Sequence, residues 1–496
     1  MAVIKPARYL VLPARDLTAN VASQGRDFLL KMSAAVGKLA TPKFTLGGTA
    51  PQFKVLDSVH ENGVKLIEAS PESLAVLRTS EPGIRIVPEV FYRRAVAPRP
   101  AVIQKIKAAA GGVAVKITVT VLAPNGQPIK GAEVVAFTNF AQRAGAQATT
   151  NAAGKAALAL GANSKKLERI FVLPATGFWP LMKSNVTINS STVLRPTPID
   201  FTFADCVRHF YGNPALTVGQ GVKVGIIDSG VASHADLVLN GGLNTVTGES
   251  PTAFGDNGTE GHGTHVAGIV AARGSAPSGM RGVAPGVTLR SYRVFGQGAD
   301  SASNFAIVKA IDAAVADGCD CINMSLGGGD QDPATDDAIS AARAAGTVVF
   351  AANGNDDRSP VSFPAAFDLC LAVAAMGRKG MFPAGAATQS RVASPFGTDP
   401  NDFVASFSNI GSDTDLIGPG VGVVSTVPAG YAIMDGTSMA CPAITGAAAR
   451  VLSQNSAVIG MPRDQARSNA IISLLVSNTT PRGFGAIFEG RGLIGA

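Results

Sequence analysis

From about residue 200 onward, the chain alternates apolar strand-like runs with helical runs, and this alternation restricts the possible folds most strongly. The expected strands are 222–227, 287–294, 319–325 and 347–351, and the expected helices begin at His262, Asn304 and Thr335. Near-continuous apolar strands separated by helices are typical of a parallel sheet with helices on both faces. We therefore predict an α/β unit over residues 200–496, with functional residues at strand carboxyl ends and helix N-termini.

A serine opens one of the apolar helical runs. Ser438 follows a Gly-Thr pair and precedes the alanine-rich run 443–452, which predicts a buried helix. Free backbone N–H groups and the positive end of the helix dipole stabilise negative charge at such a position. Pro442 fits a first helical turn, where proline is tolerated. Taken alone, however, the stretch favours a structural N-cap serine.

Three more polar residues occupy comparable positions. Asp228 directly follows the first expected strand, where it could orient a histidine, although an Asp before Ser-Gly is also a common turn residue. His262 opens an apolar helix, and Asn355 follows a buried strand, where its amide could stabilise an oxyanion. His262 and His265 share a helix face, but no third ligand follows at a suitable spacing, so no metal site is predicted.

Four short motifs around these residues resemble those of the subtilisin-like serine proteases. In chain order they are Asp228-Ser229-Gly230, His262-Gly263-Thr264-His265, Gly354-Asn355-Asp356 and Gly436-Thr437-Ser438-Met439-Ala440. The order Asp, His, Asn, Ser is also that of subtilisin itself. The resemblance extends from about residue 204 to 494. One such motif would be weak, whereas four in order at the expected strand and helix ends are specific.

The resemblance implies a serine endopeptidase. Ser438 would be the nucleophile, His262 the general base, and Asp228 the group that orients the imidazole. Asn355 and the Ser438 backbone N–H would form the oxyanion hole. The implied substrate-binding residues are Ser325, Leu326 and Gly327 as an edge strand, Ala352, Asn353 and Gly354 as walls of the S1 pocket, and Ser362 near its floor. Small walls imply an apolar or aromatic P1 side chain.

Residues 1–97 alternate strand and helix signals in the order βαββαβ, the ferredoxin-like α+β pattern. The expected strands are 9–12, 53–56, 64–67 and 84–92, and the expected helices are 26–38 and 71–77. By resemblance, this region is an inhibitor-like prodomain that acts as an intramolecular inhibitor of a zymogen. Its last strand would lie in the active site, and autocatalytic cleavage is expected between Tyr92 and Ala97.

Residues 98–112, which carry Pro, Ala and Gly, predict a linker, and residues 113–195 change to a period of two. Short strands are expected at 115–121, 134–137, 156–160, 170–173 and 186–188, which together predict a small all-β sandwich. This region resembles Ig-like or carboxypeptidase-regulatory-like modules. Its role would be that of a spacer or a partner-binding module.

Charge is distributed unevenly along the chain. Residues 1–199 hold 25 Lys and Arg against 10 Asp and Glu, a net of +15, whereas residues 200–496 hold 17 against 25, a net of −8. Two halves of opposite charge would attract each other, although unrelated surface charge explains the split equally well. No nucleic-acid partner is predicted, and the expected partners are protein or peptide substrates and the chain's own prodomain.

The sequence also excludes several classes. Five cysteines without metal-ligand spacing argue against a disulfide framework. The sequence contains no run of 18 apolar residues, so no membrane span is predicted. The first residues lack the apolar core of a secretory signal, which leaves localisation open between the cytoplasm and export by another route.

Two segments depart from the family pattern. Residues 273–281 replace a loop that holds calcium in many relatives, so no cofactor is expected to be required, and a calcium site stays open. Residues 377–400 form an insertion of about 20 residues, expected to be a surface loop. Two alternatives to an active protease are a latent enzyme whose β-sandwich binds a partner and an inactive relative, which the four filled catalytic positions disfavour.

Overall fold

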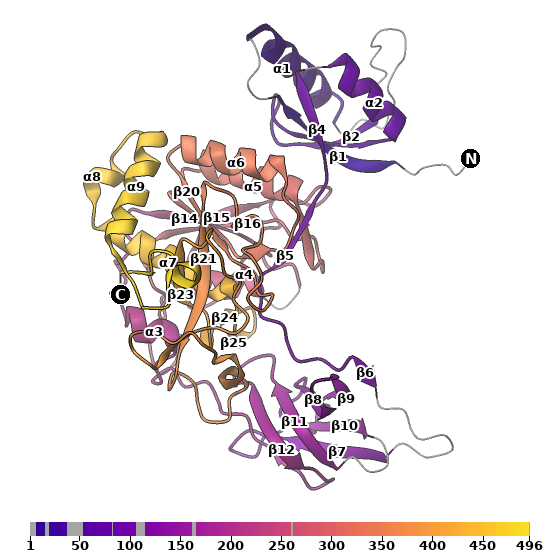
Figure 1. Cartoon of the computed structure of the whole chain (residues 1–496), viewed down its shortest axis with the longest axis vertical. Helices are drawn as coiled ribbons and strands as arrows, with labels where there is room; N and C mark the ends of the chain where they lie inside the picture. The colour runs from indigo at the N-terminus through magenta and orange to yellow at the C-terminus, as the bar shows by residue number, and fades with distance from the viewer. Residues whose placement is uncertain are drawn as a thin grey trace.

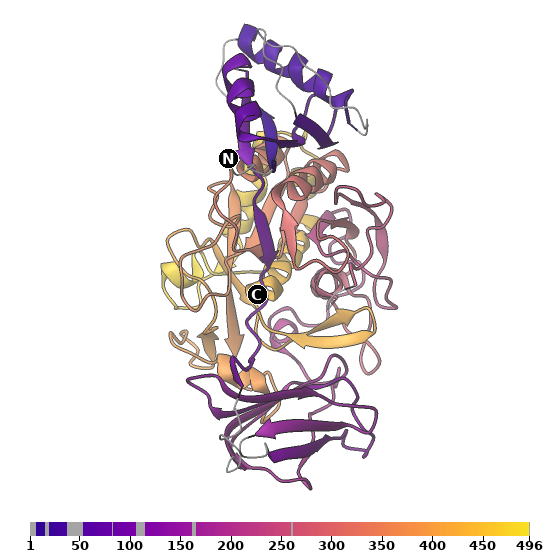
Figure 2. The same cartoon turned by 90° about the vertical axis from the view of Figure 1, so that its right-hand side faces the viewer.

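The computed structural model describes residues 6–14, 19–36, 53–81, 83–105, 115–160, 165–258 and 261–495. We divide these residues into an N-terminal unit (7–88), an arm (89–103), a sandwich (104–194) and a main unit (200–495). Figures 1 and 2 show the main unit in the middle, with the N-terminal unit at one end and the sandwich at the other. The end of the predicted first helix (37–38) and the second part of the predicted linker (106–112) lie outside the described residues. Of the helices described, none is long and apolar enough to cross a bilayer.

The main unit is built on an eight-stranded sheet in the order β15-β16-β14-β18-β20-β21-β22, with β23 beside β21. Its strands are β14 (Lys223–Asp228), β15 (Leu239–Asn244), β16 (Thr288–Arg293), β18 (Cys321–Met324), β20 (Val348–Ala352), β21 (Cys370–Arg378), β22 (Asp402–Val404) and β23 (Leu416–Pro419). All pairs are parallel except β21 with β22. The four strands predicted from apolar runs are confirmed. The other four were missed because β15 is glycine-rich and polar, β21 is rich in alanine, and β22 and β23 are short.

Helices cover both faces of this sheet, so the predicted α/β fold is confirmed. They are α3 (Cys206–Tyr211), α4 (His262–Ala271), α5 (Asn304–Ala316), α6 (Pro333–Ala344), the 3-10 helix η1 (Ala387–Arg391), α7 (Thr437–Ser453), α8 (Ser456–Ile459), α9 (Gln465–Ser477) and α10 (Ala486–Glu489). α4 and α7 pack into a core on one face, and α5 and α6 pack into a core on the other. Ser303 and Asp332 cap α5 and α6 by accepting hydrogen bonds from backbone N–H groups of the first turn.

Pro442 lies deeper in its helix than the sequence predicted. α7 begins at Thr437, so Pro442 is an interior residue and not a first-turn residue. Proline has no N–H to donate to the carbonyl four residues earlier, which belongs to Ser438. The Ser325 hydroxyl donates to that carbonyl instead, over 2.9 Å. The proline therefore frees a backbone acceptor beside Ser438, and a side chain from another strand satisfies it.

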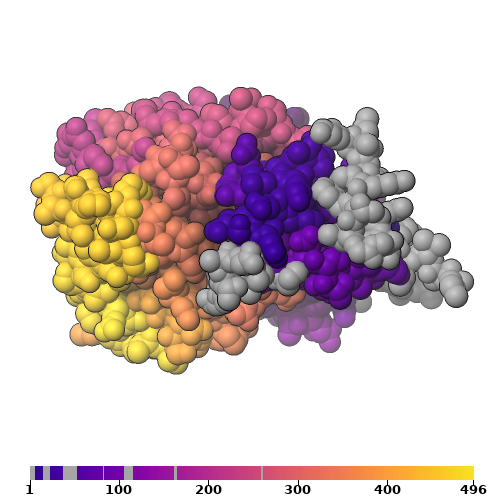
Figure 3. Space-filling model, turned by 90° about the horizontal axis from the view of Figure 1, so that it is seen from above, coloured from indigo at the N-terminus to yellow at the C-terminus, as the bar shows by residue number. Residues whose placement is uncertain are grey.

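The N-terminal unit holds a four-stranded antiparallel sheet in the order β2-β3-β1-β4. Its elements are β1 (Ala7–Pro13), α1 (Ala19–Ser33), β2 (Phe53–Ser58), β3 (Lys65–Ala69), α2 (Pro71–Ser80) and β4 (Ile84–Pro88). Leu10, Leu12 and Leu66 of this sheet are buried in one core with Phe305, Val308 and Ala334 of the main unit. Seen from this end, the N-terminal unit lies on the main unit (Figure 3).

Ion pairs at this interface run in both directions. Arg85 pairs with Asp337, as the overall charge split would predict, whereas Asp57 pairs with Lys309 at 2.9 Å in the opposite sense. Apolar burial and specific pairs therefore hold the two units together, and net charge alone does not account for the docking.

The sandwich consists of a three-stranded sheet, β10-β7-β13, and a five-stranded sheet, β12-β11-β8-β9-β6. Its strands are β6 (Gln104–Lys105), β7 (Val115–Val121), β8 (Glu133–Asn139), β9 (Ala144–Thr149), β10 (Lys155–Leu160), β11 (Lys166–Leu173), β12 (Leu181–Thr187) and β13 (Val193–Leu194). The five predicted strands are present, with shifted ends. β9 was missed because it consists mainly of small residues, and β6 shows that the predicted linker contains a short strand.

The insertion at 377–400 is more than a surface loop, because the sandwich docks on it. Ala387 donates its N–H to the Pro180 carbonyl at 2.7 Å, and Met182 donates to Gly385 at 2.9 Å. Trp179 is buried in a cluster with Ala386 of the insertion. The insertion therefore fixes the sandwich to the main unit.

Candidate functional site

Three of the predicted residues lie at strand or helix ends of the main unit. Asp228 is the last residue of β14, His262 is the first residue of α4, and Ser438 is the second residue of α7. The Asp228 Oδ1 atom lies 2.8 Å from Nδ1 of His262, and all three side chains are buried. A Cβ on Gly263 would lie 2.4 Å from the Gly230 carbonyl oxygen, so only glycine lets α4 approach β14 this closely. The glycine after His262 thus serves the Asp–His contact.

The second ring nitrogen of His262 makes no hydrogen bond. His262 Nε2 is buried and has no hydrogen-bond partner, and the Ser438 hydroxyl donates to the Ser325 carbonyl at 2.9 Å. Rotation about the Ser438 Cα–Cβ bond would move its Oγ away from that carbonyl. The imidazole nitrogen is therefore available as a proton acceptor.

Asn355 presents a free amide donor beside the serine. Its Oδ1 accepts from the Thr437 backbone N–H at 2.9 Å and from the Thr437 hydroxyl at 3.2 Å, which fixes the orientation of the amide. Its Nδ2 is buried and unpartnered. A buried unsatisfied donor costs stability, which is typical of a group reserved for a ligand. Thr437 was not predicted, although it stands inside the Gly-Thr-Ser motif.

The arm passes directly through this site. Its strand β5 (Phe91–Arg94) pairs antiparallel with both β17 (Ser301–Ser303) and β19 (Leu326–Gly327). Ala95 donates its N–H to the Ser325 carbonyl at 3.2 Å, and its own carbonyl accepts from the Ser438 N–H at 3.1 Å. A Cβ on Gly436 would lie 2.8 Å from the same Ala95 oxygen, so glycine is needed for this approach. The Ala95–Val96 peptide bond therefore lies against the serine.

Tyr92 anchors the arm three residues before Ala95. Its side chain is fully buried in the core that includes Leu326, and its ring lies against Gly329, where a Cβ would be 2.5 Å from a ring carbon. Its hydroxyl donates to Asp332, and burial together with this carboxylate raises the pKa of Tyr92 far above its usual value. This pocket sets the register of the arm.

Several of the residues predicted to form the S1 pocket lie close to one another. Ser362 Oγ donates to the Asn353 carbonyl at 3.0 Å, and it lies 2.7 and 2.8 Å from the positions that Cβ atoms on Gly327 and Gly354 would take. The Ser362 hydroxyl thus lies between the two glycine walls. The Asn353 side chain donates to the Thr414 hydroxyl at 2.9 Å, so it supports the wall from behind.

The second histidine of the motif, His265, lies in the protein interior. His265 is completely buried, and its Nε2 lies 3.2 Å from the Ala432 carbonyl oxygen. Burial, reinforced by neighbouring His262, lowers the pKa of His265 to about 3. In the described ranges, no group of three or more His, Cys, Asp or Glu side chains could hold a metal ion.

The loop that departs from the calcium-binding pattern is occupied by its own cationic side chains. Arg281 donates to the carbonyls of Gly274 and Pro214 at 2.8 and 2.7 Å, and Arg273 donates to Pro285. Of these acceptors, the Gly274 carbonyl belongs to residues 273–281, so one loop oxygen of the kind that calcium binds already accepts from a guanidinium group.

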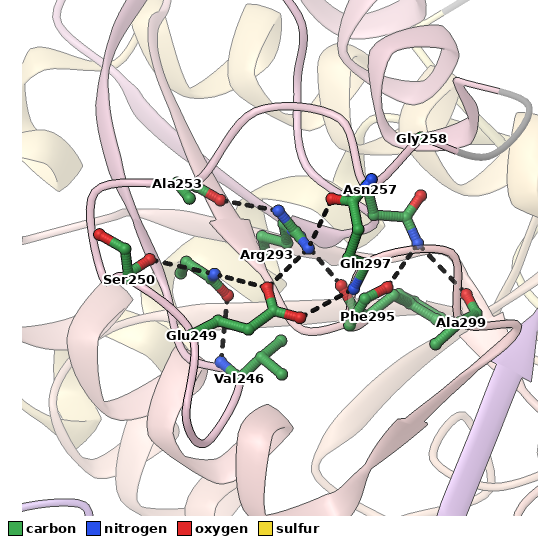
Figure 4. Close-up of polar contacts among 12 residues, drawn as sticks. Val246, Glu249, Ser250, Ala253, Asn257, Gly258, Arg293, Phe295, Gln297 and Ala299 are labelled. Carbon is green, nitrogen blue, oxygen red and sulfur yellow. Dashed lines mark hydrogen bonds and ion pairs between the residues drawn. The ribbon is translucent and has the colours of Figure 1, made fainter.

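A buried arginine lies at the end of β16, next to the loop that leads to β17. Arg293, at the end of β16, donates to Glu249 at 2.7 Å and to the carbonyls of Ala253 and Phe295 (Figure 4). The Asn257 amide donates to two carbonyls of the loop that leads to β17. These contacts join two loops that carry no regular structure.

Comparisons with known proteins agree with this geometry. A family model described as "Subtilase family" matches residues 219–490. Subtilisin DY of Bacillus licheniformis is 41% identical over 242 residues, which are 48% of this chain and 78% of that protein. Subtilisin Savinase of Lederbergia lenta is 37% identical over 244 residues, 49% of this chain and 80% of that protein. Alkaline elastase YaB of Bacillus sp. (strain YaB) is 36% identical over 270 residues, 54% and 64% of the two chains.

Proposed function

The chain belongs to the subtilase family of serine proteases, and from this premise we propose that Ser438, His262 and Asp228 are its catalytic triad. The main support is the hydrogen bond from the Ser438 N–H to the Ala95 carbonyl. His262 Nε2 and Asn355 Nδ2 are buried without hydrogen-bond partners. These groups supply a substrate position, a base and an oxyanion donor.

In the proposed reaction, Ser438 Oγ turns from Ser325 and attacks the scissile carbonyl carbon while its proton moves to His262 Nε2. The carbonyl oxygen becomes an oxyanion that accepts from the Ser438 N–H and from Asn355 Nδ2. Asp228 holds Nδ1 protonated and stabilises the imidazolium. The C–N bond then breaks, the amine takes the proton from Nε2, and an acyl-enzyme remains. Water, deprotonated by the same nitrogen, releases the acid and restores the serine.

We further propose that the N-terminal unit and the arm keep the protease as a zymogen until autocatalytic cleavage of the Ala95–Val96 bond. This bond lies within the interval Tyr92 to Ala97 predicted from sequence. Support comes from the two strand pairings of β5, the buried Tyr92 and the shared apolar core under the N-terminal unit. The arm would then be both the first substrate and the intramolecular inhibitor.

Specificity follows from the same contacts. The P1 residue is proposed to be apolar and small, because Ala95 is buried and the Ser362 hydroxyl lies between the walls of its pocket. The P4 residue is proposed to be aromatic, as Tyr92 is. The reaction as written requires no cofactor.

Hydrolysis of a peptide that copies residues 90–97 tests this function. The incubated wild-type protein should cut it after Ala95, and Ser438→Ala should leave it intact. A variant elsewhere on the same helix, Arg450→Lys, should retain the activity, because Arg450 lies near the other end of α7, where its guanidinium donates to the Tyr211 carbonyl at 3.3 Å. Equal cleavage by wild type and Ser438→Ala would contradict the proposal.

A further inference from the structure

Beyond the Ala95–Val96 bond, the arm continues into a cleft of about 330 Å³ between the main unit and the sandwich. We name this the downstream cleft and define it by Asp357, Arg391 and Asp435 of the main unit and Phe140, Arg143 and Arg169 of the sandwich. Figures 1 and 2 both show the arm running from the main unit to β6 at the edge of the sandwich. The cleft therefore begins at the proposed scissile bond and ends on the sandwich.

The cleft holds the arm through the arm's backbone. Ala97 N–H donates to the Asp435 carbonyl at 2.9 Å, and Arg391 Nη2 donates to the Pro98 carbonyl at 2.9 Å. Beyond the cleft, two further bonds hold the arm on the sandwich, from Val102 N–H to Gln147 Oε1 at 2.9 Å and from Ile103 N–H to the Arg143 carbonyl at 3.0 Å. Backbone groups are common to all polypeptides, so another extended chain can make the same kind of bonds.

The walls of the cleft are fixed before any substrate arrives. The Arg391 Nε atom pairs with Asp435 at 3.2 Å, which ties η1 to the segment that precedes Ser438. The sandwich is held on the insertion by Trp179 and by two backbone hydrogen bonds. Binding to a preorganised wall does not have to offset the entropy of ordering it.

The sandwich end of the cleft is positively charged. The Arg169 guanidinium lies 3.8 Å from the centre of the Phe140 ring, and Arg143 is exposed beside it. The neighbouring Glu168 carboxylate accepts from the Phe140 N–H at 2.8 Å. No ion pair joins either arginine to a carboxylate in the part of the chain that the structure describes.

We propose that the downstream cleft binds the residues of a polypeptide substrate that follow the scissile bond, and that Arg143 and Arg169 select acidic side chains among them. In the arm, Val96 is the first of these residues, and Arg99 and Pro100, the fourth and fifth, line the cleft. After self-cleavage, a substrate chain replaces this part of the arm. The inference rests on the proposed protease function, and it makes the sandwich part of the substrate-binding site.

Peptides that share residues 90–95 of the arm and differ downstream test the inference on the processed full-length protein. A short peptide ends at Ala97. Long peptides continue to Ile103 and carry Asp, Asn or Lys in place of Arg99. The long Asp peptide should have the highest kcat/KM, about fivefold above the long Lys peptide, which is the scale of exposed charge pairs.

Charge reversal distinguishes specific contacts from general damage. Arg143→Glu combined with Arg169→Glu should invert the preference, so that the Lys peptide is cut faster than the Asp peptide. The control pair Lys116→Glu and Lys155→Glu changes the same charge on exposed residues of the other sheet and should leave the preference unchanged. An unchanged preference in the arginine variant, or equal rates for short and long peptides, would overturn the inference. If even the short peptide stays intact, the protease proposal fails and the inference fails with it.

Discussion

Tyr92 should determine whether a polypeptide is cut, because its whole side chain is buried in the cleft. An aromatic side chain buries about 150–250 Å², and at about 25 cal/mol per Å² this corresponds to roughly 4–6 kcal/mol as an upper bound. Core truncations of aromatic residues cost about 3–5 kcal/mol, and a peptide that relaxes in an open cleft should lie near the lower end. A peptide of residues 90–101 with Ala in place of Tyr92 should therefore lose about 100-fold or more in kcat/KM.

Two further peptides make this expectation specific. Phe in place of Tyr92 removes the hydroxyl, which donates to Asp332 and contacts the Asp330 carbonyl at 3.4 Å, and should cost about tenfold, since hydrogen bonds to charged groups contribute about 1.5 kcal/mol or more. Ala in place of Phe91, which is 51% exposed, should change kcat/KM less than twofold. Cleavage would be followed by chromatography and mass spectrometry. A larger loss at Phe91 than at Tyr92 would refute the register of the arm.

Three other changes probe the oxyanion donor, the P1 pocket and a buried histidine. Asn355→Leu should lower kcat by about 10²–10³ with little change in KM, the magnitude already known for subtilisin itself; a change in KM alone would contradict the assigned role. Ser362→Gly should raise the ratio of kcat/KM for Phe over Ala at P1 by about tenfold, because it empties the space between Gly327 and Gly354, and an unchanged ratio would place the pocket elsewhere. His265 has a folded-state pKa of about 3 against about 6.5 unfolded, so the unfolded state binds the extra proton. The free energy of unfolding should fall by about 1.4 kcal/mol per pH unit below pH 6.5, and His265→Gln should remove that part of the slope in denaturant titrations at pH 4–7.

The sequence was sufficient for residues whose position depends on local pattern. Asp228, His262 and Ser438 each stand where an apolar strand ends or an apolar helix begins, and hydrophobic periodicity locates such points well. Asn355 follows β20 in the same way. Placing these residues at one edge of a parallel sheet required only the rule for strand carboxyl ends.

Features that depend on contacts between distant segments could not be predicted from the sequence. The position of Ala95 on Ser438 goes with the burial of Tyr92 against residues more than 200 positions away, and no local signal marks it. The Arg391–Asp435 pair and the docking of the sandwich on the insertion are of the same kind. Pro442 was misplaced because α7 begins at Thr437, directly after Gly436, and not at the alanine-rich run that follows the proline.

Ser438 is proposed to act on the peptide bond that it contacts in this structure. Intact-mass measurement and N-terminal sequencing of incubated wild type beside Ser438→Ala test it most directly. The wild type should yield a fragment that ends at Ala95 and a new N-terminus at Val96, and Ser438→Ala should stay uncut. A new N-terminus at another residue, or the same cut in Ser438→Ala, would contradict it.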